Sequence, residues 1–292
     1  MRFKKFFIEI TNVCNLSCPF CPKTARPPAF MTPALFEKIL TGVAGKAEDL
    51  YFHVLGEPLL HPELGRFLDS SAERGFRVRL VTNGTLLREA GEMLLSKPAL
   101  KQVSVSLHSF GSRPGLESYL DSVLGFARRA SAAGVLVTLR LWNQDAEGRV
   151  SEGDRAVLDA LRTEFRFSDP IPGDMGPGRG VRLAPRIFLS SMSRFEWPSL
   201  DSDSPEEEGA CLGVRAQAAV LAAGEVVPCC LDRDGVVLLG NIRERPFDEI
   251  LSGERARGIA EAFRRGRAAE RLCRKCGYKK RFSGRAPTSA PK

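Results

Sequence analysis

The eight cysteines of this 292-residue chain fall into two groups that lie far apart in the sequence. Disulfide scaffolds occur in short secreted proteins, whereas this chain is long and starts without the apolar stretch of a signal peptide. It contains only three histidines, so a histidine-built metal centre is not expected. We therefore predict thiolate metal sites in a cytoplasmic protein. The two groups are Cys14, Cys18 and Cys21, and Cys211, Cys229, Cys230, Cys273 and Cys276.

The composition is that of a globular protein. With 43% hydrophobic and 27% charged residues, the chain is not expected to be mostly disordered. No stretch approaches the ~18 apolar residues that a membrane span needs. The net charge of +8 is concentrated in residues 253–292, which alone carry +10. This basic end predicts either a solvated surface that offsets an anionic metal–thiolate centre, or a contact with nucleic acid.

Strand and helix signals alternate through the first 190 residues. A helix is expected to begin at Thr32-Pro33, and others to end at Gly75 and Gly134 and to cover 151–165. Such alternation predicts a parallel sheet with right-handed crossovers, flat or barrel-like, but six repeats are too few for a complete eight-fold barrel. We predict an α/β fold with a partial (β/α)6 TIM-like barrel. The expected strands are Lys5–Ile10, Leu50–Leu55, Phe76–Thr82, Gln102–Leu107, Val135–Leu141 and Arg186–Ser190.

Two breaks separate this core from the rest of the chain. Residues 168–186 are too rich in Pro and Gly for a regular element, and 201–208 are mostly Asp, Ser and Glu. Beyond them we expect a hairpin of 216–222 and 226–229, a short strand at 236–239, and then helices. The predicted domains are a core at 1–195, a small C-terminal α+β domain at 205–280 that contains the second cysteine group, and a basic tail at 281–292.

The segment Thr11-Asn12-Val13-Cys14-Asn15-Leu16-Ser17-Cys18-Pro19-Phe20-Cys21 directly follows the first predicted strand. Its loop should lie at the carboxyl end of that strand, where α/β folds place active sites. Three thiolates spaced C-x3-C-x2-C can bind three irons of a cubane and leave the fourth iron open. Electron-transfer clusters use four cysteines instead. The alternative is a zinc knuckle, which requires a fourth ligand nearby.

The spacing, with Phe20 just before the third cysteine, resembles the radical S-adenosylmethionine (radical SAM) superfamily. The resemblance implies that Cys14, Cys18 and Cys21 bind a [4Fe–4S] cluster whose open iron chelates the methionine part of SAM. One electron then cleaves a carbon–sulfur bond, and the 5′-deoxyadenosyl radical formed abstracts hydrogen from a substrate. The resemblance also implies an external reductant such as flavodoxin or ferredoxin.

Further stretches resemble the SAM-binding parts of that family. Gly56-Glu57-Pro58 resembles the Gly-Gly-Glu-Pro stretch that holds the SAM amino group. The resemblance likewise implies SAM contacts for Asn83 of Thr-Asn-Gly, for Ser106, and for Arg140 through the SAM carboxylate. Each also has a structural explanation, since such residues occur in ordinary turns and packed strands.

The second cysteine group resembles the shortened SPASM extension called Twitch. That resemblance implies an auxiliary [4Fe–4S] cluster held by Cys211, Cys229, Cys273 and Cys276, although the same four thiols could bind structural zinc. Four protein ligands leave no open iron, so this centre would accept electrons. The implied reaction is a net oxidation of a small molecule or peptide.

Cys230 is left over from both ligand sets. It could be a packed free cysteine, or its S–H could return a hydrogen atom to the substrate radical, as in some radical peptide epimerases. A radical peptide maturase is therefore the first alternative function. The others are an RNA-modifying enzyme that uses the basic C-terminal segment, and a zinc-stabilised binding module without enzymatic activity.

Overall fold

The computed structural model describes residues 2–111, 113–145, 149–166, 181–194, 196–202 and 208–282. The chain forms two compact units, which are described separately. The first unit consists of Met1–Val13, Pro19–Gly56 and Glu196–Lys292, and the second of Cys14–Cys18 and Glu57–Phe195.

The strands of the first unit follow the order β10-β9-β8-β1-β2. Strand β1 is parallel to both of its neighbours, with Phe6 opposite Leu50 of β2 and Ala218 of β8. Strands β8 and β9 form an antiparallel hairpin that β10 extends. The strands are β1 (Lys5–Ile8), β2 (Asp49–Phe52), β8 (Gln217–Val220), β9 (Glu225–Val227) and β10 (Gly240–Asn241).

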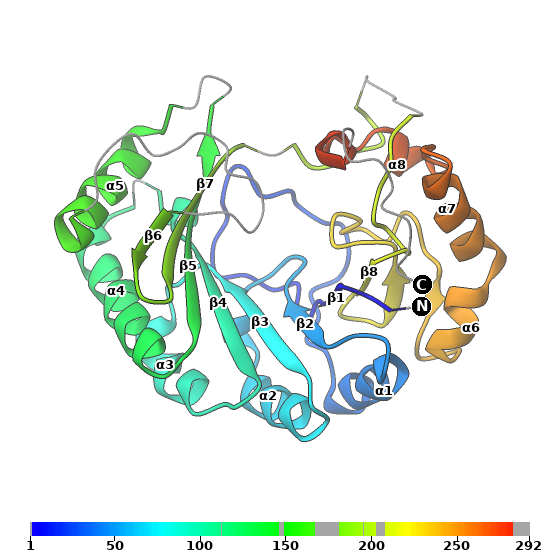
Figure 1. The fold of residues 1–292 in the computed structure, drawn as a ribbon, viewed down its shortest axis with the longest axis horizontal. Helices are drawn as coiled ribbons and strands as arrows, with labels where there is room; N and C mark the ends of the chain where they lie inside the picture. Colours follow the sequence, from blue (N-terminus) through cyan, green and yellow to red (C-terminus); the bar gives the residue numbers. More distant parts are fainter. Residues whose placement is uncertain are drawn as a thin grey trace. The chain divides into compact units, whose positions relative to one another are not determined.

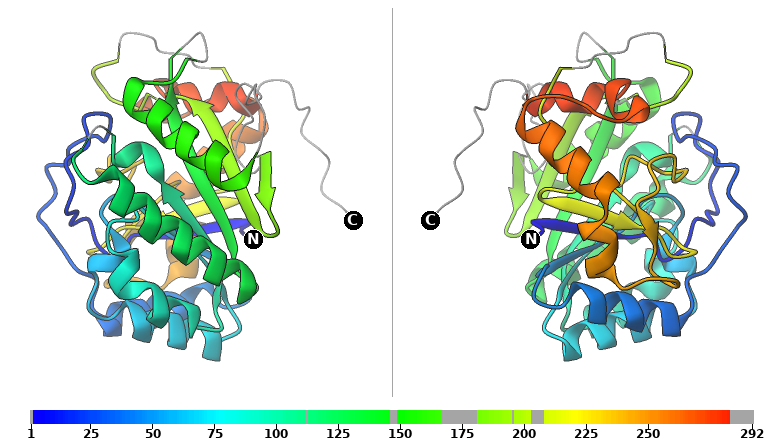
Figure 2. Two further views of the ribbon diagram at one scale, coloured as in Figure 1. Left: turned by 90° about the vertical axis from the view of Figure 1, so that its left-hand side faces the viewer. Right: turned by 90° about the vertical axis from the view of Figure 1, so that its right-hand side faces the viewer.

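Helices pack on these strands through aromatic side chains. The ring of Phe247 meets that of Phe6 edge-on at 5.4 Å, and both side chains are fully buried. Figure 2 shows α6 and α7 beside the hairpin strands. Helix α1 begins as predicted, because the Thr32 side chain accepts a hydrogen bond from Leu35 N. The helices are α1 (Pro33–Val43), α6 (Phe247–Ser252), α7 (Glu254–Arg264), α8 (Arg271–Arg274) and the 3-10 helix η3 (Gly277–Phe282).

The second unit has the strand order β3-β4-β5-β7-β6, and only β6 is antiparallel to its neighbour. Helices α2 to α5 line one side of its strands in Figure 1. Its elements are η1 (Pro58–Leu60), α2 (Leu64–Glu73), β3 (Arg77–Thr82), α3 (Leu87–Leu95), β4 (Leu100–Ser106), η2 (Leu107–Ser109), α4 (Leu116–Ala132), β5 (Leu136–Gln144), α5 (Glu152–Phe165), β6 (Val181–Ala184) and β7 (Ile187–Ser193).

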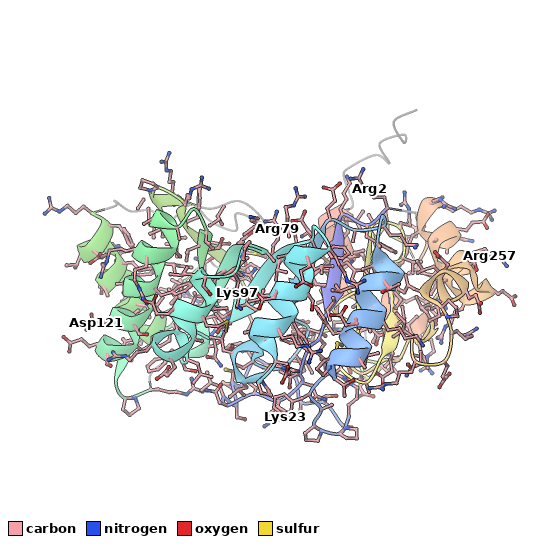
Figure 3. The ribbon with its side chains drawn as sticks, turned by 90° about the horizontal axis from the view of Figure 1, so that it is seen from below. Arg2, Lys23, Arg79, Lys97, Asp121 and Arg257 are labelled. Carbon is pink, nitrogen blue, oxygen red and sulfur yellow. The ribbon has the colours of Figure 1, made fainter. Side chains whose placement is uncertain are left out.

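Side chains along β5 alternate between an apolar and a polar face. Val137, Leu139 and Leu141 are buried, whereas Arg140 and Trp142 are only half-buried. Successive strand residues point to opposite sides of a sheet, so one side packs on helices and the other presents polar groups. On the helical side, Lys97 contacts Asp69 at 2.7 Å and joins the end of α3 to α2 (Figure 3).

The predicted alternation of strands and helices is confirmed. Each of the six expected strands overlaps an observed strand, and the hairpin at 216–229 is present. Helices α2 and α4 end before Gly75 and Gly134, which have positive φ, and α5 begins after Ser151. The predicted α/β class is therefore correct.

Two local predictions are wrong. Residues 236–239 form a turn and an irregular stretch and not a strand, because the Asp232 carboxylate accepts hydrogen bonds from Val236 N and Val237 N at 2.8 and 2.7 Å. Those amides cannot then join a β-ladder. The expected irregular segment 168–186 contains strand β6, which pairs with β7. The remainder of that segment, to residue 180, lies outside the described residues, as does most of the predicted basic tail.

Candidate functional site

The loop that carries the first cysteine motif leaves the carboxyl end of β1 and is closed at its base in the first unit. Met31 N donates to Ile10 O at 2.7 Å, and Thr11 Oγ1 donates to Ala29 O at 2.8 Å. Asn12 Oδ1 accepts a hydrogen bond from Ala29 N at 2.7 Å. These bonds join residues 10–12 to residues 29–31, so the two ends of the loop are held side by side.

Gly56 packs directly against this base. Its φ is +76°, and a β-carbon placed there would lie 2.3 Å from Thr11 O and 2.9 Å from Val13 O. Only glycine can occupy such a backbone position without a steric clash. The predicted site residue Gly56 therefore packs, through its backbone, against the residues that begin the cysteine motif.

Cys14 and Cys18 belong to the second unit, where Asn83 lies beside them. Asn83 Nδ2 donates to Asn15 Oδ1 at 2.9 Å and lies 3.9 Å from Cys14 Sγ. Cys18 Sγ donates to Ser109 O at 3.5 Å. Burial is the main cause that raises the pKa of Cys14, and the charge of Cys18 adds to it. The structure thus brings the predicted residue Asn83 together with two predicted thiols.

Phe20 and Cys21 lie in the first unit. Phe20 is half-buried, whereas Cys21 is exposed, with its Sγ 3.9 Å from Pro22 O. The third thiol of the motif is therefore on the accessible part of the loop.

Glu57 is a buried carboxylate in the second unit. Its Oε1 accepts hydrogen bonds from Thr82 Oγ1 at 2.8 Å and Leu59 N at 3.0 Å, and its Oε2 accepts one from Asn83 N at 2.7 Å. Burial raises the pKa of Glu57, although these hydrogen bonds oppose the shift. The carboxylate joins η1 to the end of β3, and its contact with SAM stays a prediction.

Ser106 and Arg140 are neighbours on the polar side of β4 and β5. They face each other in the strand register, and Ser190 of β7 lies opposite Arg140 on the other side. The Arg140 guanidinium lies 4.4 Å from the centre of the Trp142 ring, whose Nε1 donates to Ser190 Oγ at 3.0 Å. The two predicted residues therefore belong to one polar surface of the second unit.

Sequence reasoning missed several members of this polar surface. Gln102 Nε2 donates to Thr138 Oγ1 at 3.0 Å, which links β4 to β5 below Ser106 and Arg140. Trp142 and Ser190 were not predicted either. The available signal was the alternation of polar and apolar residues along β4 and β5, which places the polar members on one face.

His108 supports this surface from η2. Its Nδ1 lies 3.0 Å from the carbonyl oxygen of Arg140 and 3.4 Å from Trp142 N. Burial lowers the pKa of His108 to about 4. The imidazole is therefore neutral at physiological pH and holds the backbone of β5 in place.

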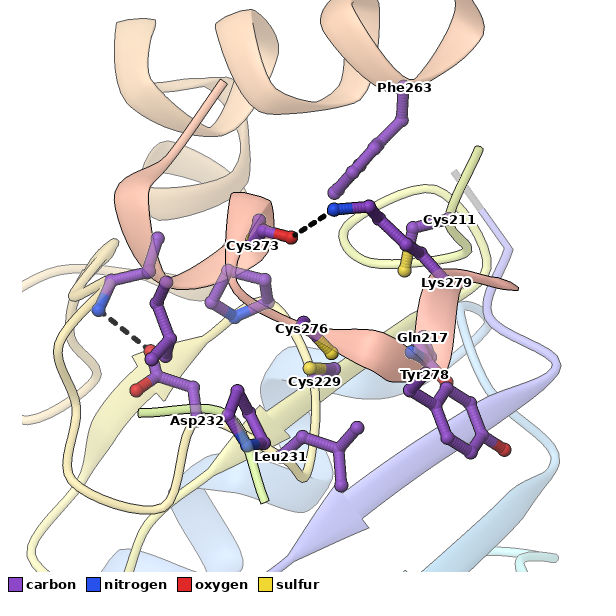
Figure 4. Close-up of a pocket in the computed structure, with 14 residues that line it drawn as sticks. Cys211, Gln217, Cys229, Leu231, Asp232, Phe263, Cys273, Cys276, Tyr278 and Lys279 are labelled. Carbon is purple, nitrogen blue, oxygen red and sulfur yellow. Dashed lines mark hydrogen bonds between the residues drawn. The ribbon is translucent and has the colours of Figure 1, made fainter. Parts of the chain in front are cut away.

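The four predicted auxiliary ligands line a single cavity in the first unit (Figure 4). Cys211 precedes β8, Cys229 follows β9, and the remaining two lie on α8 and just after it. The empty space of the cavity is ≈ 470 Å³, including the part open to solvent. Within the described ranges, no three Cys, His, Asp or Glu side chains meet at the spacing of a single metal ion.

Burial governs the protonation of the thiols that line this cavity. Burial raises the pKa of Cys229 well above its ordinary value, and the neighbouring thiols Cys211 and Cys273 raise it further. Without metal, the cavity therefore favours neutral thiols, and a bound cationic cluster would displace their protons. Lys279 is 2% exposed and donates to Cys273 O and Arg274 O, which brings a positive charge to the cavity wall.

Cys230 is not one of the residues that line the cavity. It packs against a buried apolar cluster of Phe7, Val54, Ala219, Leu221 and Val227. Burial raises its pKa to about 12. In this structure Cys230 has the surroundings of a packed free cysteine.

The basic C-terminal segment is partly paired within itself. Arg255 forms two hydrogen bonds with Glu270 at 2.8 Å, and Arg265 contacts Glu261 at 2.6 Å. Such pairs are typical of a solvated helix surface. Contact of this segment with nucleic acid stays a prediction.

Two family models match the chain. The radical SAM superfamily model matches residues 8–142, and the iron–sulfur cluster-binding domain SPASM matches residues 211–277. The protein is a radical SAM enzyme that carries a SPASM domain. These families imply a [4Fe–4S] cluster that binds SAM and an auxiliary iron–sulfur cluster, and the cysteine-lined cavity supplies donors of the right chemistry for the latter.

Two curated relatives match nearly the whole chain. The S-adenosyl-L-methionine-dependent 2-deoxy-scyllo-inosamine dehydrogenase of Niallia circulans is 21% identical over 94% of this chain and 92% of its own length. The AdoMet-dependent heme synthase of Methanosarcina barkeri is 25% identical over 94% of this chain and 89% of its own length.

Solved structures share the fold. BtrN in complex with AdoMet and 2-DOIA has a TM-score of 0.61 at 20% identity and covers 95% of this chain and 94% of its own. SuiB of Streptococcus suis, bound to the precursor peptide SuiA, has a TM-score of 0.61 at 16% identity, over 98% and 74%. The α/β fold with a partial barrel agrees with these structures. Among the described helices, none combines the length and hydrophobicity that crossing a membrane requires.

Proposed function

We propose that this enzyme cleaves SAM reductively and carries out a net oxidation of its substrate, with the auxiliary cluster as electron acceptor. The main support for an electron acceptor is the set of four thiols around one cavity, because four protein ligands leave no open coordination site for a substrate. The full-length similarity to a SAM-dependent dehydrogenase supports the same reaction class.

Cys14, Cys18 and Cys21 would hold the first cluster, and Asn83 would position the loop beside Cys14. When bound, the reduced cluster and SAM supply a 5′-deoxyadenosyl radical, which removes a hydrogen atom from the substrate. Cys211, Cys229, Cys273 and Cys276 would hold the second cluster, which would supply an acceptor for one electron. A two-electron oxidation of the substrate would release that electron together with one proton to solvent.

The polar surface of the second unit favours a polar substrate or the polar parts of SAM. Arg140 supplies a fixed cation stacked on Trp142, and Ser106 and Ser190 supply hydroxyl groups on either side of it. A guanidinium of this kind binds carboxylates well. We propose that Arg140 pairs with the SAM carboxylate and that Gly56, Glu57 and Phe20 complete the SAM site.

We also propose the domain boundaries 1–195, 205–280 and 281–292. The two family matches, at 8–142 and 211–277, lie inside the first two of these ranges. We propose a small molecule or a peptide as the substrate, a flavodoxin or ferredoxin as the reductant and a cytoplasmic location.

The test is anaerobic incubation of the iron-loaded protein with SAM, a reductant and candidate substrates. Formation of 5′-deoxyadenosine establishes SAM cleavage, and a product about 2 Da lighter than the substrate identifies a two-electron oxidation. A product with the mass of the substrate in ordinary water, and one that carries a deuterium when the reaction is run in deuterated water, would instead indicate epimerisation. A protein that binds zinc and no iron would refute the proposal.

A further inference from the structure

Glu9 is the first residue after β1 and its side chain is completely buried in the first unit. Its two oxygens accept hydrogen bonds from Arg26 Nη1 and Nη2, both at 2.7 Å. They also accept from Leu55 N at 3.3 Å and Ala222 N at 3.0 Å. A single carboxylate therefore joins the ends of β1, β2 and β8 to the cysteine loop.

Arg26 lies five residues after Cys21, on the same stretch of loop. Its side chain is 14% exposed, so the ion pair with Glu9 is largely shielded from water. Burial alone would lower the pKa of Arg26, but the hydrogen bonds and charge of Glu9, together with the charges of Glu225 and Asp234, raise it. The arginine is thus a fixed cation surrounded by carboxylates.

Asp234 makes a second connection to the same loop. Thr24 Oγ1 donates to Asp234 Oδ1 at 2.6 Å and also accepts a hydrogen bond from Arg26 N at 3.2 Å. Asp234 lies two residues from Asp232, which lines the cavity of the auxiliary cysteines. The contacts of Glu9 with Ala222 and of Thr24 with Asp234 both reach the segment that the SPASM model matches.

We propose that Glu9 and Arg26, with Thr24 and Asp234, form a latch by which the SPASM segment positions the loop stretch that follows Cys21. The ion pair of Glu9 and Arg26 is its shielded part, and the Thr24–Asp234 bond is its exposed part. The inference rests on the proposed function, because it assigns to these residues the orientation of a cluster ligand. The bidentate pair fixes the direction of the Arg26 side chain as well as its distance from Glu9. Glu9 and Arg26 are positioning residues, since they act through the loop.

The first test is hydrogen exchange of the full-length, iron-loaded protein. In Arg26→Met the latch is lost, so amides in peptides covering 22–31, 54–56 and 221–223 should exchange on the order of tenfold faster, which corresponds to about 1.4 kcal/mol. Arg128→Met is the control, because it removes an exposed pair with Glu164 in the other unit. Unchanged exchange at 22–31, or an equal increase in every peptide, would overturn the proposal.

The second test is a double-mutant cycle of Glu9→Gln, Arg26→Met and their combination. The KM for SAM should rise about tenfold in each single variant and no further in the double variant, with a smaller change in kcat. The electron paramagnetic resonance spectrum of the reduced protein with SAM should change in the same three variants and not in Arg128→Met. Additive effects on KM, or spectra identical to wild type, would contradict the latch.

Failure of the proposed function is distinguishable from failure of the latch. If the wild-type protein does not cleave SAM, the enzymatic proposal is wrong, while the exchange data still decide whether Arg26 holds the loop. If SAM is cleaved and the exchange pattern of Arg26→Met matches wild type, only the latch is wrong.

Discussion

A β-carbon on Gly56 would lie 2.3 Å from the carbonyl oxygen of Thr11, well inside contact distance. The turn after β2 and the start of the cysteine loop therefore meet backbone to backbone. Any side chain at position 56 must push the base of that loop away from this turn.

We predict that Gly56→Ala lowers the free energy of unfolding by more than the ~1–2 kcal/mol that a left-handed backbone conformation costs an ordinary residue. The matched control is Gly45→Ala, because Gly45 has a similar φ of +71° but no heavy atom within 4 Å of the added carbon. Thermal and denaturant unfolding of both variants measure the difference. Equal losses would show that the approach of Thr11 is harmless.

Cysteine substitutions in the two groups should both lower the iron content, but they should differ in their effect on SAM cleavage. Replacing Cys14, Cys18 or Cys21 with Ala should remove about four of roughly eight irons and abolish 5′-deoxyadenosine formation. Replacing Cys273 should also lower the iron content but preserve SAM cleavage, while substrate oxidation is lost. Iron analysis and chromatography of the nucleoside check both results. Full turnover by the Cys273 variant would exclude an electron acceptor at the second site.

Cys230→Ala discriminates between the two leading reaction classes. Because Cys230 packs on an apolar cluster and not on the cavity, a dehydrogenase should keep its turnover to within about twofold. An epimerase that uses Cys230 as hydrogen donor would lose its epimerised product and still consume SAM. Product analysis by mass spectrometry in deuterated water separates these outcomes.

Asn83 should control the reactivity of Cys14 in the iron-free protein. Its side chain stabilises the Cys14 thiolate, so Asn83→Ala should raise the pKa of Cys14 further. Asn83→Asp should raise it more, because it adds a negative charge beside the sulfur. Alkylation rates at fixed pH, followed by peptide mass spectrometry, should fall in the order wild type, Asn83→Ala, Asn83→Asp. The rate at Cys276 is the internal control, and the reverse order would be inconsistent with the contact.

His108 should make the protein less stable in acid. Burial lowers its folded pKa to about 4 from 6.5, so the unfolded chain binds a proton before the folded chain does. Its stabilising contribution is complete above about pH 6.5 and is lost as the pH falls toward 4, up to about 3 kcal/mol. Denaturant unfolding of wild type and His108→Asn between these pH values measures the difference. Parallel pH curves would contradict this assignment.

The parts of the site that sequence predicted are those encoded by local spacing. The C-x3-C-x2-C motif, the hairpin before Cys229 and the Cys273–Cys276 pair can each be found within a short window. The structure groups Cys211, Cys229, Cys273 and Cys276 around one cavity, whose lining does not include Cys230. The strands were found because their apolar residues either alternate with polar ones, as in β5, or form a short continuous run, as in β1.

The latch could not be found in this way. Glu9 is a lone carboxylate in the sequence, and its partners Arg26 and Ala222 lie 17 and 213 positions away. Local pattern carries no information on such pairings. The strand predicted at 236–239 failed for a related reason, because its apolar residues suggested a ladder while the Asp232 side chain had already taken two of its amides.

Strand β8 lies inside the SPASM match and runs parallel to β1, the strand that leads into the first cysteine motif. Deleting the C-terminal third would therefore remove the β8 partner of β1. Strand β1 would then become an exposed edge strand that is prone to aggregation. Dissection of the two redox centres must proceed by point substitution, and a truncated chain that precipitates would say nothing about electron flow. Through the same pairing, the segment matched by the SPASM model contributes a strand beside the one that leads into the first cysteine motif.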